Sequence, residues 1–188
     1  MSERSAALDR PTGLGWLVLG GTAALLLRAR LLTIPVDQRV WLLAAIYGAV
    51  AIASGVAPIR PARAVLARWV VLAIGLSGVA AASVAAGPVI RAPMGPWSIP
   101  LALLAAVAEE LLFRRAVYGW LERRGAGPAV AGSALAFAAI HVPLYGVTAL
   151  PVDMGAGLLL SWQRWAAGTW TVPAATHGAA NLLAVLLR

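Results

Sequence analysis

Apolar segments separated by short polar breaks run along the whole chain. The breaks carry prolines and glycines, which end helices. A helix needs about 20 residues to cross a bilayer, and most of the runs approach that length, so they predict membrane-spanning helices. The runs cover residues 13–32, 40–57, 65–87, 97–121, 128–143, 147–163 and 170–187. The pattern predicts an all-α, polytopic transmembrane bundle of about seven helices, in which 128–143 or 147–163 is a candidate for a tilted or incompletely spanning helix.

The composition supports the membrane assignment and excludes several kinds of site. Hydrophobic residues make up 61% of the chain and charged residues 12%, whereas soluble domains are about half apolar and a quarter charged. Because apolar runs fill the whole length, we expect one membrane domain over residues 1–188 and no soluble domain. The absence of cysteine excludes disulfides, thiolate metal sites and a cysteine nucleophile.

The positive charge predicts an orientation rather than a nucleic-acid partner. The net charge of +8 comes from 15 arginines without any lysine, and arginines in membrane-protein loops mostly set topology. Seven spans place ten arginines on the N-terminal side, namely Arg4, Arg10, Arg60, Arg63, Arg68, Arg114, Arg115, Arg123, Arg124 and Arg164, against five on the other side, namely Arg28, Arg30, Arg39, Arg91 and Arg188. We therefore expect a multi-pass protein of the cell membrane (inner or plasma membrane) with a cytoplasmic N-terminus, whose first run is a retained anchor.

Two adjacent carboxylates, Glu109 and Glu110, lie inside the run 97–121. An ionisable residue within a membrane span is expensive and is by default a candidate for function. On a helix Glu110 stacks on Arg114, four residues later, whereas Glu109 has no partner within the helix. The face of Glu109 carries mostly small residues that let another helix approach closely, namely Ala102, Ala105, Ala106, Phe113 and Ala116. Glu109→Gln is thus expected to leave folding close to wild type, and Glu110→Gln to destabilise the protein by removing the counter-charge of Arg114.

The two histidines of the chain, His141 and His177, also fall inside apolar runs. Phe137 precedes His141 by four residues, and Asn181 follows His177 by four, so each pair shares a helix face. Glu109 lies sixteen residues before Gly125 and His141 sixteen after it. In an antiparallel hairpin both therefore sit at the same level, roughly 24 Å from the turn, where a carboxylate and an imidazole can hold and activate a water. His177 is expected roughly 9 Å off that level on straight helices.

Structural interpretations of the same residues remain open at this point. A single buried histidine is more often a packing residue than a catalyst, and an intramembrane asparagine often joins helices. The Glu110–Arg114 pair is readily explained as structural. Asp153 lies beside Pro151 near the start of a segment, which favours no chemical role for it.

The three motifs together resemble those of the CPBP membrane proteases. The motifs are Glu109-Glu110-x-x-x-Arg114, Phe137-x-x-x-His141 and His177-x-x-x-Asn181, in this order along the chain. That family includes the type II CAAX prenyl endopeptidases and bacteriocin-processing or immunity proteins. The resemblance covers roughly residues 97–187, a four-helix catalytic core within 97–188, and residues 1–96 match only as generic preceding helices.

The resemblance implies a glutamate-dependent intramembrane endopeptidase that needs no cofactor and no metal. Glu109 would be the general base, His141 would help hold the attacking water, His177 and Asn181 would stabilise the oxyanion, and Arg114 would brace Glu110. The partners implied are the lipid bilayer and a peptide or membrane-protein substrate, prenylated or C-terminal in some relatives, with no nucleic acid. Two alternatives remain: a zinc-dependent membrane metalloprotease using the histidines and glutamates, or a non-catalytic membrane scaffold or immunity protein.

Overall fold

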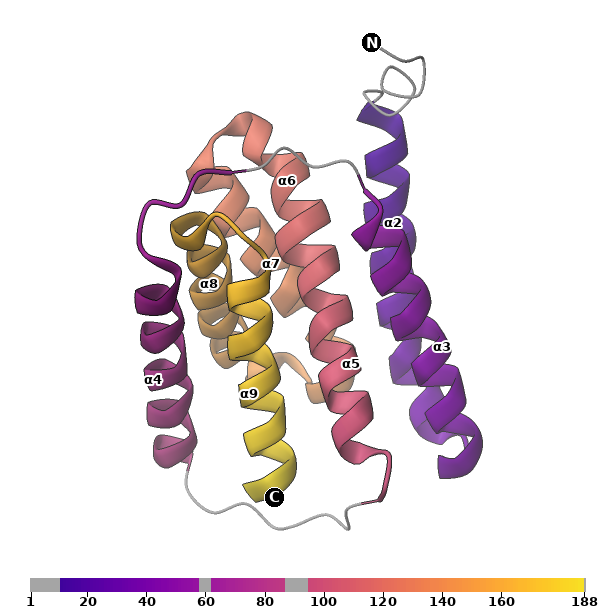
Figure 1. Ribbon diagram of the computed structural model, residues 1–188. Helices are drawn as coiled ribbons and strands as arrows, with labels where there is room; N and C mark the ends of the chain where they lie inside the picture. Colours follow the sequence, from indigo (N-terminus) through magenta and orange to yellow (C-terminus); the bar gives the residue numbers. More distant parts are fainter. Residues whose placement is uncertain (1–10, 58–61, 87–94, 188) are drawn as a thin grey trace.

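The computed structural model describes residues 11–57, 62–86 and 95–187, and this part of the chain is an all-helical bundle without strands (Figure 1). The predicted fold class is confirmed. The helices are α2 (Pro11–Leu27, continued by a 3₁₀ turn Arg28–Thr33), α3 (Val36–Gly55), α4 (Arg68–Ala86), α5 (Ser98–Glu110, continued by a π-helical turn Leu111–Val117 and by α6, Tyr118–Leu121), α7 (Ala126–Tyr145), α8 (Leu150–Ala167) and α9 (Thr171–Leu187).

The helices have the lengths and composition of a multi-pass membrane protein. Four of the described helical stretches are long and apolar enough to cross a bilayer: Gly13–Leu31, Val36–Gly55, Arg68–Ala85 and Ala126–Tyr145. The last of these is α7, which is longer than the sequence predicted. The helix α8 is 18 residues long and carries Asp153, Gln163 and Arg164, so polar groups interrupt its apolar surface.

The helices form two layers, and α5 lies in the middle of one of them. The helix α5 packs between α3 and α9, and α9 in turn packs between α5 and α4. The helices α7 and α8 lie behind this row in Figure 1 and pack closely on each other. Close approach depends on a small residue there, because a side chain at Gly157 of α8 would lie 2.9 Å from the Ala134 carbonyl oxygen of α7.

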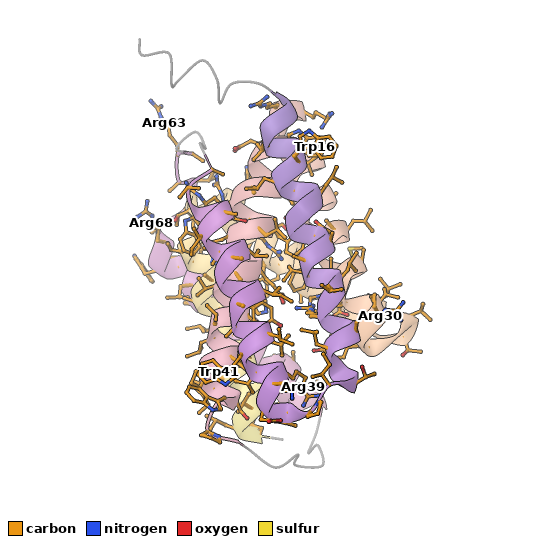
Figure 2. The ribbon with its side chains drawn as sticks, turned by 90° about the vertical axis from the view of Figure 1, so that its right-hand side faces the viewer. Trp16, Arg30, Arg39, Trp41, Arg63 and Arg68 are labelled. Atoms are coloured by element: carbon orange, nitrogen blue, oxygen red, sulfur yellow. The ribbon has the colours of Figure 1, made fainter. Side chains whose placement is uncertain are left out.

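The two ends of the bundle carry arginine and tryptophan. Figure 2 shows Arg63 and Arg68 toward the end where the described chain begins, and Arg39 and Trp41 toward the opposite end. Tryptophan and arginine at helix ends are typical of the membrane–water interface. The cytoplasmic location of the N-terminal side stays a prediction.

Several arginines of the topology count are buried or bound inside the bundle. Arg28, Arg114 and Arg164 are buried inside the bundle. Arg115 donates hydrogen bonds to two backbone carbonyl oxygens at the end of α3, those of Ser54 and Ala57. The exposed arginines Arg63, Arg68, Arg123 and Arg124 are still on the N-terminal side, so the direction of the charge bias is unchanged without the buried ones.

Candidate active site

A π-helical turn directly follows the two glutamates. It spans Leu111–Val117 within the long helix from Ser98 to Leu121. Such turns loosen the regular backbone hydrogen bonds and are frequent at functional sites. Side chains from the neighbouring helices bind the carbonyls of this turn: the Ser133 hydroxyl donates to Phe113 over 2.8 Å, and Arg164 Nε donates to Arg114 over 3.0 Å. These bonds satisfy backbone oxygens that lipid could not satisfy and fix the turn against α7 and α8.

Glu110 and Arg114 form the ion pair that the sequence predicts. Arg114 Nε lies 3.3 Å from Glu110 Oε2, and both side chains are fully buried. Arg114 also donates to the Gly157 carbonyl oxygen, and its guanidinium lies 4.6 Å from the centre of the Phe137 ring. The other oxygen of Glu110, Oε1, lies 3.0 Å from His177 Nδ1. Glu110 therefore joins the arginine to the third motif, a contact that the sequence analysis missed.

Glu109 meets groups from three other parts of the bundle. Its Oε1 accepts a hydrogen bond from Arg28 Nη1 in a buried ion pair. Its Oε2 lies 3.7 Å from His141 Nε2 and 4.0 Å from His177 Nε2. The prediction that Glu109 has no partner within its own helix is correct, but Arg28 compensates its charge across the bundle. The available signal was the position of Arg28 at the end of an apolar run, because a charge there needs a partner.

Hydrogen bonds on the far side of each imidazole fix the tautomers. His141 Nδ1 lies 2.8 Å from the Phe137 carbonyl oxygen, and His177 Nδ1 lies 3.0 Å from Glu110 Oε1. Both oxygens only accept, so each Nδ1 carries the hydrogen. A neutral histidine with its proton on Nδ1 presents a lone pair at Nε2. In its neutral state each ring thus directs its Nε2 lone pair toward Glu109.

Three acceptors meet at one point of the site: Glu109 Oε2, His141 Nε2 and His177 Nε2. Their separations of 3.7 and 4.0 Å exceed a hydrogen bond, and Glu109 Oε2 is buried without a hydrogen-bond partner among the described groups. Polar groups at such separations are commonly bridged by water. A water molecule can donate to two acceptors, so the arrangement suits a water held against the carboxylate.

The depths of His141 and His177 in the bundle can be compared with the depths that the sequence predicted. The predicted match in level between Glu109 and His141 is confirmed by their contact. The predicted offset of His177 is wrong, because its ring reaches both glutamates. The turn between α8 and α9 lies lower in Figure 1 than the turn between α6 and α7. Counted from its preceding turn, His177 therefore needs fewer residues along α9 to reach the level that Glu109 (on α5) and His141 (on α7) reach from the turn at Gly125.

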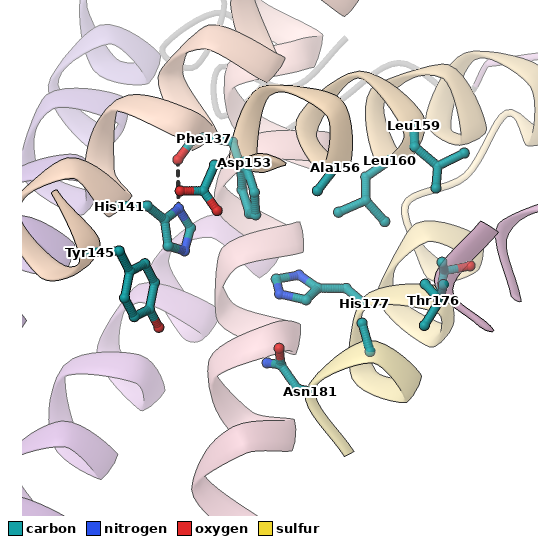
Figure 3. Close-up of a pocket in the computed structure, with 12 residues that line it drawn as sticks. Phe137, His141, Tyr145, Asp153, Ala156, Leu159, Leu160, Thr176, His177 and Asn181 are labelled. Atoms are coloured by element: carbon teal, nitrogen blue, oxygen red, sulfur yellow. Dashed lines mark hydrogen bonds between the residues drawn. The ribbon is translucent and has the colours of Figure 1, made fainter. Parts of the chain in front are cut away.

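A cavity of about 200 Å³ opens beside the two histidines. Figure 3 shows His141 and His177 reaching toward the same space, with Asn181 one turn beyond His177. One amide hydrogen of Asn181 is used, since Nδ2 donates to the Ala102 carbonyl oxygen of α5 over 3.0 Å. The cavity is lined mostly by apolar or aromatic side chains, together with Asp153, namely Val79, Phe137, His141, Tyr145, Asp153, Ala156, Leu159, Leu160, Thr176, His177, Ala180 and Asn181.

The comparison with known protein families agrees with this geometry. The family model described as type II CAAX prenyl endopeptidase Rce1-like matches residues 91–183. The matched region, residues 91–183, belongs to this family. The predicted resemblance is thereby confirmed, and the Rce1-like region contains all seven residues that the three motifs single out, from Glu109 to Asn181. No curated protein and no solved structure matches the chain.

The Rce1-like match supports a protease activity, and the long apolar helices support a multi-pass membrane protein. The Rce1-like region holds both glutamates, both histidines, Asn181 and Arg114 in one contiguous cluster. Arg28 lies outside the matched residues. Within the described ranges, no three acidic or histidine side chains are arranged to hold a metal ion.

Proposed function

We propose that this protein is an intramembrane endopeptidase that uses Glu109 to activate a water molecule for peptide hydrolysis. The observation that supports it most is the convergence of Glu109 Oε2 with His141 Nε2 and His177 Nε2, inside a bundle of apolar helices. An isolated packing histidine does not require a second histidine at the same carboxylate oxygen. We place the activity in a catalytic core over residues 97–188 of a single membrane domain.

In the first step, a water held by Glu109 and His141 attacks the carbonyl carbon of the substrate. A bond forms between the water oxygen and the carbonyl carbon, and the water gives one proton to Glu109 Oε2. The carbonyl oxygen becomes an oxyanion. In the second step, the carbon–nitrogen bond breaks, and the proton on Glu109 passes to the leaving amine, which regenerates the carboxylate. Proton transfer by a positioned carboxylate contributes about 10²–10⁴-fold to such reactions.

The oxyanion would be stabilised by Asn181 and His177. Asn181 uses one amide hydrogen on Ala102, and the second remains for the oxyanion. His177 has its Nδ1 hydrogen committed to Glu110, so it can donate from Nε2 only as an imidazolium. That extra proton has to come from solvent before the attack, because the proton released by the attacking water goes to Glu109. In a low-dielectric site such fixed donors act strongly on developing negative charge.

The cavity suggests the kind of substrate. Aliphatic and aromatic side chains make up most of its wall, which suits an apolar segment of a membrane-associated chain. Prenylated or C-terminal peptides, as the family description indicates, are one such class, and we include them among the candidates without restricting the activity to them. Asp153 lies in the same wall, so the cavity is not uniformly apolar.

The test is cleavage by the purified protein in lipid vesicles. A panel of membrane-anchored peptides, with prenylated and unprenylated versions of the same sequence, is digested in ¹⁸O-water, and the products are analysed by mass spectrometry. We expect one ¹⁸O atom in the new carboxyl group and no cleavage by Glu109→Gln. Glu122→Gln serves as the matched control, since Glu122 lies in the 3₁₀ turn before Gly125, outside the site. A folded wild-type protein that cleaves no peptide would instead support the scaffold or immunity function, and unchanged cleavage by Glu109→Gln would exclude the mechanism.

A further inference from the structure

We propose that Arg28 is a positioning residue for this reaction, which holds Glu109 ionised and turns its second oxygen toward the histidines. The inference rests on the proposed function of Glu109. It extends the site beyond the Rce1-like region, because Arg28 comes from the N-terminal part of the chain that the family model does not match. The N-terminal helices would then complete the active site as well as anchor the protein.

The two oxygens of Glu109 have separate partners. Oε1 accepts from Arg28 Nη1, while Oε2 is left to the side of the two imidazoles. If Arg28 were absent, rotation of the carboxylate would carry either oxygen to either side. A single charged hydrogen bond to Oε1 removes that freedom and leaves the reactive oxygen in place, which is how a fixed neighbour pre-organises a catalytic group.

Packing of α2 against the π turn delivers Arg28 to the site. A side chain at Gly21 of α2 would lie 2.8 Å from Leu112 Cδ1, so the helix approaches closely there. Leu25, one turn further along α2, is fully buried in the same core cluster as Leu112. Arg28 follows one turn later and is 5% exposed, and Glu109 is 3% exposed. Contacts along α2 therefore fix the position of the guanidinium, which does not depend on a flexible surface loop.

The charges around Glu109 explain why it needs this partner. Glu110 and Arg114, on its own helix, already form a pair with each other. The remaining titratable groups near Glu109 are Tyr47 on α3, His141 on α7, Asp153 on α8 and His177 on α9. None of these carries a permanent positive charge. Arg28 is accordingly the permanent cation that contacts Glu109 among the described residues.

Removal of that cation should change how activity depends on pH. A carboxylate without a counter-charge in a low-dielectric site takes up a proton more readily, and a protonated Glu109 cannot act as a base. The acidic limb of the kcat/KM profile should therefore move to higher pH in Arg28→Met and Arg28→Gln, by about one to three pH units, the usual effect of a contacting opposite charge. Arg28→Lys keeps the charge, and its acidic limb should stay near that of the wild type.

Arg30→Met is the matched control, since Arg30 lies two residues away in the same 3₁₀ turn and is exposed. We expect it to leave both the activity and the profile unchanged. Arg28→Gln is included because the glutamine amide still donates a hydrogen bond, and because glutamine is large enough to fill much of the space of the arginine. A folded neutral variant at Arg28 with the wild-type acidic limb would overturn the proposal.

A second measurement does not depend on the folding of any Arg28 variant. Infrared difference spectra between the wild type and Glu109→Gln report the carboxyl group of Glu109 directly. We expect the band of an ionised carboxylate at neutral pH, and the band of a protonated carboxyl at neutral pH would overturn the proposal. The proposed function fails separately, if Glu109→Gln cleaves like the wild type. If Glu109→Gln abolishes cleavage and no substitution of Arg28 reduces it, the proposed function stands and the role of Arg28 is excluded.

Discussion

Glu109 and Glu110 are adjacent in the chain, and their isosteric substitution to glutamine should separate catalysis from stability. Each carboxylate is buried and paired with one arginine, Glu109 with Arg28 and Glu110 with Arg114. Breaking a buried ion pair by neutralising one partner costs about 3–5 kcal/mol. Both variants should therefore be less stable than the wild type. The helix face alone predicted a loss for Glu110→Gln and none for Glu109→Gln, and the contact with Arg28 changes that expectation.

The two variants should lose different amounts of unfolding free energy, because the two arginines left without a carboxylate keep different contacts. Arg114 keeps the Gly157 carbonyl oxygen and the Phe137 ring when Glu110 is neutralised, so that loss should be near 3 kcal/mol, at the lower end of the range. When Glu109 is neutralised, Arg28 retains its interaction with the Tyr47 hydroxyl, while its Nε and Nη2, like Nε and Nη1 of Arg114, have no hydrogen-bond partner among the described residues. Arg28 has no backbone carbonyl or ring face comparable to those of Arg114, so the cost should approach 5 kcal/mol.

Activity should separate the two variants more sharply than stability does. Glu109→Gln removes the proposed base, so kcat should fall by at least about 10²–10⁴-fold. Glu110→Gln keeps a carbonyl oxygen that can accept from His177 Nδ1, where the present distance is 3.0 Å. The histidine keeps its tautomer, and kcat per folded molecule should fall less than about tenfold.

The assay combines reversible unfolding in mixed detergent micelles with steady-state cleavage, normalised to folded protein. Asp37→Asn is the control, because Asp37 is an exposed carboxylate in the first turn of α3, where loss of charge costs at most about 1 kcal/mol. The double variant Arg28→Met/Glu109→Gln should recover most of the stability lost by Glu109→Gln and none of the activity. Equal stabilities of Glu109→Gln and the wild type would show that the buried pair with Arg28 does not stabilise the fold, and equal activities of the two glutamine variants would contradict the division of roles.

Oxyanion stabilisation, metal dependence and topology can each be tested. Asn181→Ala should lower kcat by about 10²–10³-fold with little change in KM, as for other lost oxyanion donors, and Asn181→Asp should be at least as damaging. If Asn181→Ala is thermally weakened but fully active, Asn181 has no catalytic role and serves only to bind the Ala102 carbonyl oxygen. EDTA should leave cleavage intact, and a loss restored by added zinc would favour the metalloprotease. Cysteines introduced singly at Arg124 and Val147, both exposed and at opposite ends of α7, should respectively resist and accept an impermeant thiol reagent on intact cells, and the reverse would invert the topology.

The helices and the first two motifs were predictable because they depend on local spacing. The seven runs of apolar residues predicted the described helices to within a few residues at most ends. The equal distances of Glu109 and His141 from Gly125 predicted their contact, since consecutive antiparallel helices share a reference turn. The pair Glu110–Arg114 followed from helical geometry alone.

The contacts that were missed or wrongly predicted depend on how non-consecutive helices are placed. His177 reaches Glu109 and Glu110 because the turn before α9 lies deeper in the bundle, and no spacing in the sequence records that depth. The Arg28 contact joins residues 81 positions apart, and it depends on how α2 docks on the π turn. Nothing in the regular spacing of apolar residues along this helix predicts the π turn.

The separation of Arg28 from Glu109 has a consequence for the order in which the protein is made. Ribosomes add about 5–20 residues per second, so roughly 4–16 s pass between the synthesis of the two residues, which are 81 positions apart. During that interval the first helix can enter the bilayer while the carboxylate for its arginine does not yet exist. A long arginine side chain near a helix end can extend to the lipid headgroups in the meantime. We therefore expect Arg28 of the newborn chain to stay at the membrane surface until the helix bearing Glu109 has been inserted.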